Sequence, residues 1–180
     1  MHTHANVMLN VAPHVLTDAS ELAVLVRENL DELATYATHL VGDADAGLEY
    51  VAAGIHHAGR YPPARIRVDG RVSLFRAVTR ACRHEQRFPP RPTGPARFFK
   101  RSKQSFHPEV EADAAARMNT VKRALATVAF ERRAAVLLHD MARLSYKEVG
   151  RALECSPEAA SRLLAGARRE FGSIYREIAL

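Results

Sequence analysis

Five prolines fall within residues 88–108 and divide the chain into two parts that no single helix or strand can join. Each proline lacks a backbone N–H and fixes φ, so a hydrogen-bond ladder cannot run through such a segment. On either side of it, apolar residues recur every three or four positions, which is the helical period. The sequence therefore predicts an all-α fold with two small helical domains, residues 1–87 and 109–180, joined by a basic, Pro-rich linker over residues 88–108.

The helical period and the capping residues also predict where individual helices begin and end. A short extended piece with a turn is expected at residues 66–70, where Asp69-Gly70 favours a turn. The expected helices cover residues 20–41, 44–58, 71–87, 109–128 and 131–141, followed by two short helices that begin after residues 145 and 156.

Charge is distributed unevenly along the 180 residues. Residues 1–58 have a net charge of −7, residues 59–107 of +11 and residues 108–180 of +2. The charge of +11 predicts contact with a polyanion, with nucleic acid as the leading candidate. The phenylalanines interleaved among these basic residues suit stacking on unpaired bases. A solvated basic linker is the alternative. Within the helix at 71–87, the expected DNA-facing side chains are Arg76, Arg80, Arg83 and Arg87.

Several classes of protein are not expected from this sequence. No apolar stretch is long enough for a membrane span, and no secretory signal is visible. Cys82 and Cys155 lie far apart, as is usual in a reducing cytoplasm. There is no glycine-rich phosphate loop, no nucleophile elbow and no thiol cluster, and the adjacent His56 and His57 point to different faces of a helix. We therefore expect no enzyme activity, metal, cofactor or small-molecule substrate.

The C-terminal part contains two capped helices in tandem. Ser145 and Glu148 fit a capping box, and Ser156-Pro157 supplies a second N-cap with proline at the first helical position. Two short helices joined by such a turn form a helix-turn-helix, whose second helix enters the major groove. A helical bundle without DNA contacts is the alternative. The expected DNA contacts here are Ser145, Lys147, Ser156, Glu158, Ser161, Arg162, Arg168 and Arg169, the last two at phosphates.

Short motifs within residues 121–171 carry a family resemblance. AVLL at 135–138, LSY at 144–146, EV at 148–149, CSP at 155–157 and ARR at 167–169 resemble the promoter-distal DNA-binding domain of bacterial ECF-type (extracytoplasmic function) sigma factors. LATYATHLVGDAD at 33–45 is similar to the first helix and turn of that family's other domain, and SLFRAVTRACR at 73–83 to its promoter-reading helix.

The resemblance implies a transcription initiation factor that binds RNA polymerase core and directs it to promoter DNA. It also implies a cytoplasmic, nucleoid-associated location and an anti-sigma protein as a further partner. The polymerase-binding residues it implies are Asp43, Asp45 and Glu49, with Leu48 and Val51 as exposed apolar contacts.

Two other functions stay open. Gly47 stands where the family has an acidic residue, and Ser73 where it has an aromatic one. These departures favour a sigma-like regulator that binds an anti-sigma protein, an activator or polymerase without initiating transcription. A dimeric helix-turn-helix repressor, with the N-terminal helices as its oligomerisation module, is the other.

Overall fold

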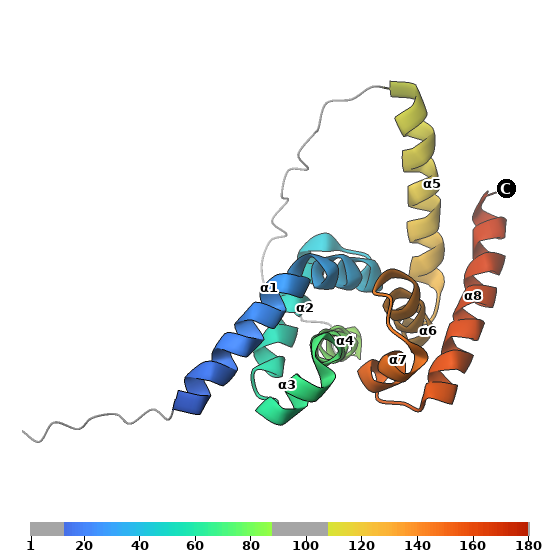
Figure 1. Ribbon diagram of the computed structural model, residues 1–180. Coiled ribbons are helices and arrows are strands. Elements are labelled where there is room, and N and C mark those ends of the chain that lie inside the picture. Colours follow the sequence, from blue (N-terminus) through green and yellow to red (C-terminus); the bar gives the residue numbers. More distant parts are fainter. Residues whose placement is uncertain (1–12, 88–107, 180) are drawn as a thin grey trace, which may run out of the picture.

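The computed structural model describes residues 13–87 and 108–179, with side chains described for residues 21–84 and 116–179. Within these ranges the chain forms helices and no strand, as Figure 1 shows, so the predicted all-α class is confirmed. The predicted linker lies outside the described residues, except for Pro108, which begins a helix.

The N-terminal part contains four helices: α1 (Pro13–Val41), α2 (Ala44–Ala58), α3 (Pro63–Asp69) and α4 (Arg71–Arg87). The bounds predicted for α2 and α4 are confirmed, and α1 ends where predicted but begins earlier. Gly42, at φ +84°, follows α1, and the Asp43 side chain then accepts a hydrogen bond from Ala46 N to cap α2. α2 and α4 approach closely at Gly54, where an added Cβ would lie 2.8 Å from the Val78 backbone.

The extended piece predicted at residues 66–70 is wrong, because these residues belong to the short helix α3 and its end. Pro63 occupies the first helical position, where its missing N–H costs nothing. Gly70, at φ +50°, ends the helix, and its N–H donates to Ile66 O. The turn predicted at Asp69-Gly70 is thus a helix C-terminus.

The C-terminal part contains α5 (Pro108–Thr127), α6 (Phe130–Val136), α7 (Tyr146–Leu153) and α8 (Pro157–Ala179). A π-helical turn, η1 (Leu137–Met141), continues α6, so the helix predicted at 131–141 changes its winding midway. α8 packs against α5, α6 and α7.

Most of the buried apolar residues, from both parts, form one cluster. In the N-terminal part, the fully buried rings of Tyr36 and Phe75 meet edge to face with centroids 5.3 Å apart, and the Tyr36 hydroxyl lies 2.7 Å from Thr79 Oγ1. Leu138 and Leu144 belong to the same cluster from the C-terminal part, because α4 packs against α7. The apolar side chains Val72, Phe75, Val78 and Cys82 of α4 are all buried in this core.

Arg133 joins the ends of α1 and α5 from inside the protein. Its guanidinium donates to the carbonyls of Leu40 at 2.8 Å, Ala126 at 2.7 Å and Val128 at 2.9 Å. Leu40 lies in the last turn of α1 and Ala126 in the last turn of α5, where helix carbonyls lack intrahelical partners and carry partial negative charge. Burial lowers the pKa of Arg133, and these carbonyls compensate the buried charge.

Candidate nucleic-acid interface

A tight turn connects α7 to α8. Glu154 follows α7 in the left-handed conformation, and Cys155 N donates to Gly150 O at 2.8 Å. An added Cβ on Gly150 would lie 2.8 Å from Cys155 O, so this position accepts glycine alone without a shift of the backbone. The Ser156 hydroxyl then accepts from Ala159 N at 3.2 Å and caps α8. Two helices held by so short a turn have the arrangement of a helix-turn-helix.

The capping box predicted at the start of α7 is confirmed. Ser145 N and its hydroxyl donate to Glu148 Oε2 at 2.8 and 2.6 Å, while Glu148 N donates to the Ser145 hydroxyl at 3.4 Å. These hydrogen bonds from the Ser145 hydroxyl and N–H hold the pKa of Glu148 below its usual range.

Replacing Ser145 with alanine is expected to lower the free energy of unfolding by about 1 kcal/mol near neutral pH. The hydroxyl's bond to the Glu148 carboxylate stabilises the fold fully above the ordinary carboxyl pKa and is lost as the pH falls through the lowered pKa. The difference between wild type and S145A should therefore shrink in acid. Urea unfolding at several pH values measures it, with Ser161→Ala as an exposed serine control; a gap that widens in acid contradicts the account.

The N-terminal turns of α8 present an exposed polar face. Ala160, Leu164 and Ala167 are buried against the rest of the C-terminal part. The exposed side chains on the opposite side include Glu158, Ser161, Arg162, Arg168 and Arg169. Of these, the sequence predicts Glu158, Ser161 and Arg162 near base edges and Arg168 and Arg169 at phosphates, and the capped end of the helix is open to solvent.

The charges on this face differ in how they are held. Within the described residues, the structure records no ion pair for Arg162 or Arg169. Arg168 Nη2 donates to Asp140 Oδ1 at 2.6 Å, an interaction that raises the pKa of Arg168. Glu158 accepts from its own backbone N–H and from Ser156, and these bonds lower its pKa. A carboxylate here repels phosphate but accepts a hydrogen bond from an exocyclic base amine, such as cytosine N4.

On α7, Lys147 is exposed beside the exposed Ser145. Tyr146 stands between them, and its ring stacks on His139 with centroids 4.9 Å apart. His139 belongs to η1, so the π-helical turn supplies the platform for this tyrosine. The sequence does not predict this pair, because the extra residue of a π-helical turn leaves no signal in hydrophobic spacing.

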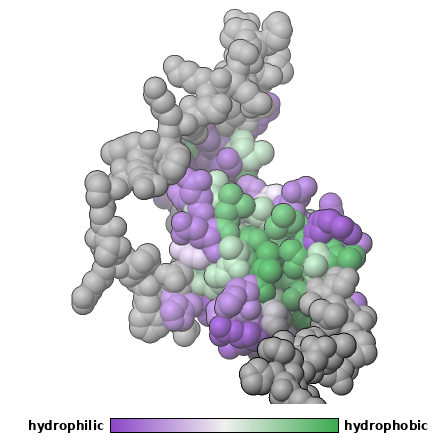
Figure 2. All heavy atoms as spheres, turned by 90° about the vertical axis from the view of Figure 1, so that its left-hand side faces the viewer, coloured by the Kyte–Doolittle hydropathy of each residue, from purple (hydrophilic) through white to green (hydrophobic). Residues whose placement is uncertain are grey.

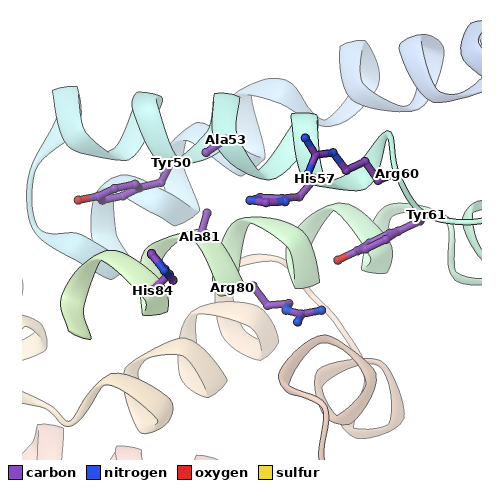
Figure 3. A pocket seen from close by; sticks show the side chains of 8 residues that line it. All are labelled: Tyr50, Ala53, His57, Arg60, Tyr61, Arg80, Ala81 and His84. Carbon is purple, nitrogen blue, oxygen red and sulfur yellow. The ribbon is translucent and has the colours of Figure 1, made fainter. Parts of the chain in front are cut away.

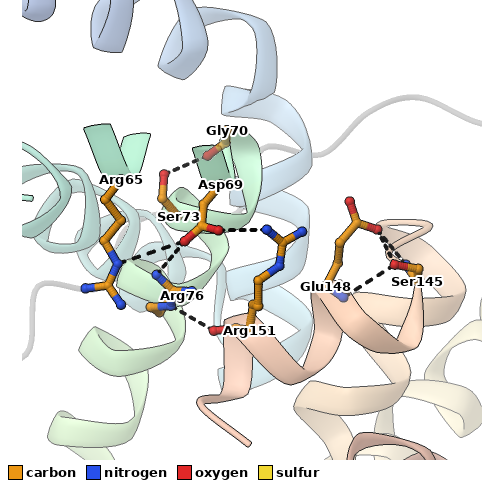
Figure 4. Close-up of polar contacts among 8 residues, drawn as sticks. All are labelled: Arg65, Asp69, Gly70, Ser73, Arg76, Ser145, Glu148 and Arg151. Atoms are coloured by element: carbon orange, nitrogen blue, oxygen red, sulfur yellow. Dashed lines mark hydrogen bonds and ion pairs between the residues drawn. The ribbon is translucent and has the colours of Figure 1, made fainter. Parts of the chain in front are cut away.

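The prediction that Arg76 of α4 faces DNA is wrong, because Arg76 is buried with 3% of its surface exposed. Its Nη1 donates to Asp69 Oδ2 at 3.0 Å and its Nε to Arg151 O at 2.7 Å. Arg151 Nη1 in turn donates to Asp69 Oδ1 at 2.8 Å, so Asp69 lies between Arg76 and Arg151, and Figure 4 also shows Arg65 paired with it more loosely, at 3.9 Å. Arg76 therefore holds α4 to α7 and offers nucleic acid no contact in this arrangement.

Arg83 and Arg80 also face the C-terminal part. Arg83 is half-buried and makes two hydrogen bonds to Glu131, at 2.8 and 2.9 Å. Arg80 is exposed and lies 3.7 Å from Glu154 at the end of α7. Arg83 departs from the predicted open basic surface, because Glu131 of α6 holds its guanidinium, whereas the Arg80 side chain stays exposed. The Arg87 side chain lies outside the described residues.

The predicted polymerase-binding residues lie on α2 and its cap. Asp43, Asp45, Leu48 and Glu49 are exposed, and Leu48 has 54% of its surface exposed. The prediction that Val51 is an exposed contact is wrong, because Val51 is 2% exposed and belongs to the core. With Gly47, Gly54 and Ala58 it forms the buried face of α2.

An apolar groove lies at the other end of α2, between α1, α2 and α3. Figure 2 shows hydrophobic side chains gathered on this face of the molecule. The groove has a volume of about 780 Å³, and its apolar lining includes Leu22, Val26, Leu30, Ile55 and Ile66. Contiguous exposed apolar surface of this kind marks sites of contact with other proteins. Nothing in the sequence spacing indicated it, because it arises from three helices meeting.

Comparison with known proteins adds no family assignment: no family model and no curated protein matches the chain. Across the described side chains, no three His, Cys, Asp or Glu residues are grouped so that they could hold a metal ion. No helix in the described ranges combines the length and apolarity needed to cross a membrane.

Proposed function

We propose that this protein is a sigma-like transcription initiation factor that binds RNA polymerase core and directs it to promoter DNA. The observation that carries the proposal is the exposed N-terminal face of α8 beyond a capped helix-turn-helix. Arg162 and Ser161 can reach base edges in the major groove, while Arg169, two turns further on, suits a phosphate. The motif resemblance over residues 121–171 supports the sigma-like assignment beyond a general DNA-binding one.

In this proposal the described arrangement is a closed state. The Arg76 and Arg83 contacts with Asp69 and Glu131 occupy arginines that the resemblance assigns to promoter DNA. Separation of α4 from α7 and α6 would release them. Polymerase binding supplies the energy for that separation, with the exposed acids Asp43, Asp45 and Glu49 as docking residues.

Binding to duplex DNA is the first experiment. We expect selection from a random duplex library to enrich one sequence. R162A should weaken binding to it by about 1–3 kcal/mol and relax the preference at one base pair. R169A should weaken binding to all sequences alike. It should also reduce the slope of log affinity against log salt concentration by about one. Unaltered binding and base preference in both variants would show that α8 does not read DNA.

A second candidate is favoured by the apolar groove between α1, α2 and α3. In this second candidate function, the chain binds another protein through the groove and regulates transcription without initiating it. A dimeric repressor is the third candidate, and light scattering separates it from the other two: a symmetric dimer favours the repressor, and a monomer favours the sigma-like functions.

A further inference from the structure

A separate cavity of about 460 Å³ lies between α2 and α4, and we call it the α2–α4 cavity (Figure 3). Ala53 of α2 and Ala81 of α4 stand on its two sides, and their small side chains leave the space between the helices open. Its polar and aromatic lining is Tyr50, His57, Arg60, Tyr61, Arg80 and His84.

The charge of this lining has one sign. No carboxylate occurs among the lining residues that the structure describes, whereas Arg60 and Arg80 each carry a positive charge. A cavity with such a lining attracts anions.

Among the described residues, the contacts of both arginines lie at the surface. Arg60 Nη2 lies 2.9 Å from His56 Nε2. Arg80 is 3.7 Å from a Glu154 oxygen, and both side chains of that pair are about half exposed. An ion pair so exposed contributes little to stability. Either guanidinium can therefore turn to an anionic ligand at little cost.

The aromatic rings select among anions. In Figure 3 the rings of Tyr50 and His57 extend from α2 over the space between the two helices, and Tyr61 lies at its end. A planar heterocycle stacks on such rings, and guanidinium groups bind phosphate. The volume falls in the range of small-ligand pockets, about 300–1,000 Å³. Inorganic phosphate alone would leave most of it unused.

We propose that the α2–α4 cavity binds a nucleoside phosphate, with the base against the aromatic rings and the phosphate charge balanced by Arg60 and Arg80. A base and a phosphate in this arrangement occur both in a free mononucleotide and in one nucleotide of a single strand. Because Arg80 also contacts Glu154 beside the α7–α8 turn, a bound phosphate competes for a contact that joins α4 to the C-terminal part.

Titration calorimetry of the full chain tests this proposal with AMP, adenosine, inorganic phosphate and a short single-stranded oligoadenylate. We expect AMP to bind and adenosine and phosphate each to bind about tenfold more weakly or worse, since each lacks half of the contacts. Equal affinity for phosphate and AMP would overturn the role of the rings. Tighter binding of the oligonucleotide than of AMP, through the same residues, would assign the ligand to a single strand.

Three variants locate the site. R60A/R80A removes both phosphate partners, and A53L fills the cavity without changing charge; each should weaken AMP binding about tenfold or more. R27A/R117A removes two exposed arginines outside the cavity and should leave the affinity for AMP within about twofold of wild type.

Circular dichroism checks that all three variants fold. Equal losses in the two double variants, no effect of A53L, or no binding of AMP or oligonucleotide at millimolar concentration would overturn the proposal. The assay needs neither polymerase nor duplex DNA, so its failure leaves the proposed function standing.

Discussion

Replacing Arg133 with methionine is expected to lower the free energy of unfolding by about 3 kcal/mol or more. Methionine keeps much of the apolar volume but supplies no donor to the carbonyls of Leu40, Ala126 and Val128. A buried carbonyl that loses its donor costs about 1–3 kcal/mol. The loss should be large because three such groups are affected together, at the ends of α1 and α5.

Urea unfolding followed by circular dichroism measures this effect, with Arg132→Met as the matched control. Arg132 is the exposed neighbour, and its Nη1 donates to Glu170 Oε2 at 2.7 Å on the surface. Its loss should cost about 1 kcal/mol or less. If R133M stays within the range of R132M, the anchoring role of Arg133 is refuted.

Asp69→Asn is the second substitution with a large expected effect, about 3 kcal/mol. The Asp69 carboxylate lies between Arg76 and Arg151, and only 4% of the Arg76 side chain is exposed. Asparagine leaves a buried guanidinium without its counter-charge and two arginines close to each other. Breaking one partner of a buried ion pair costs more than replacing the whole pair with apolar residues.

A double-mutant cycle tests this account. D69N/R76M should be less destabilised than the two single effects added together, because each single variant already removes the pair. Glu21→Gln is the control, since Glu21 pairs with Arg67 on the surface at 3.0 Å and should cost about 1 kcal/mol or less. Strict additivity in the cycle would mean that the ion pair between Asp69 and Arg76 does not contribute to stability.

The sequence predicted best those features that depend on neighbours along the chain. The bounds of α2 and α4 and the Ser145–Glu148 capping box are local, because caps, prolines and glycines act within a few residues. The same local reasoning failed at α3, where an extended piece ending in a turn at Asp69-Gly70 was expected. There Pro63 and Gly70, read together as a helix start and a helix end, would have predicted the helix.

Features that depend on distant segments were not predictable in this way. The spacing of α4 distinguishes its apolar face from its arginines, but it cannot tell that α6 and α7 cover the arginine side as well. Arg76 and Arg83 therefore lie against the C-terminal part rather than in solvent. Val51 shows the same limit: on an Ala- and Gly-rich helix, only the tertiary contact decides which apolar residue is buried.

Transcription by bacterial core RNA polymerase, on a template carrying the duplex sequence that this protein selects, tests the central claim most directly. We expect transcripts only when the protein is present, beginning at a fixed distance downstream of the selected sequence. R162A should reduce them because it weakens duplex binding through α8, and D45K/E49K should abolish them through loss of core binding while leaving duplex binding intact. Absence of transcripts from a protein that still binds both the duplex and core polymerase would contradict an initiation factor.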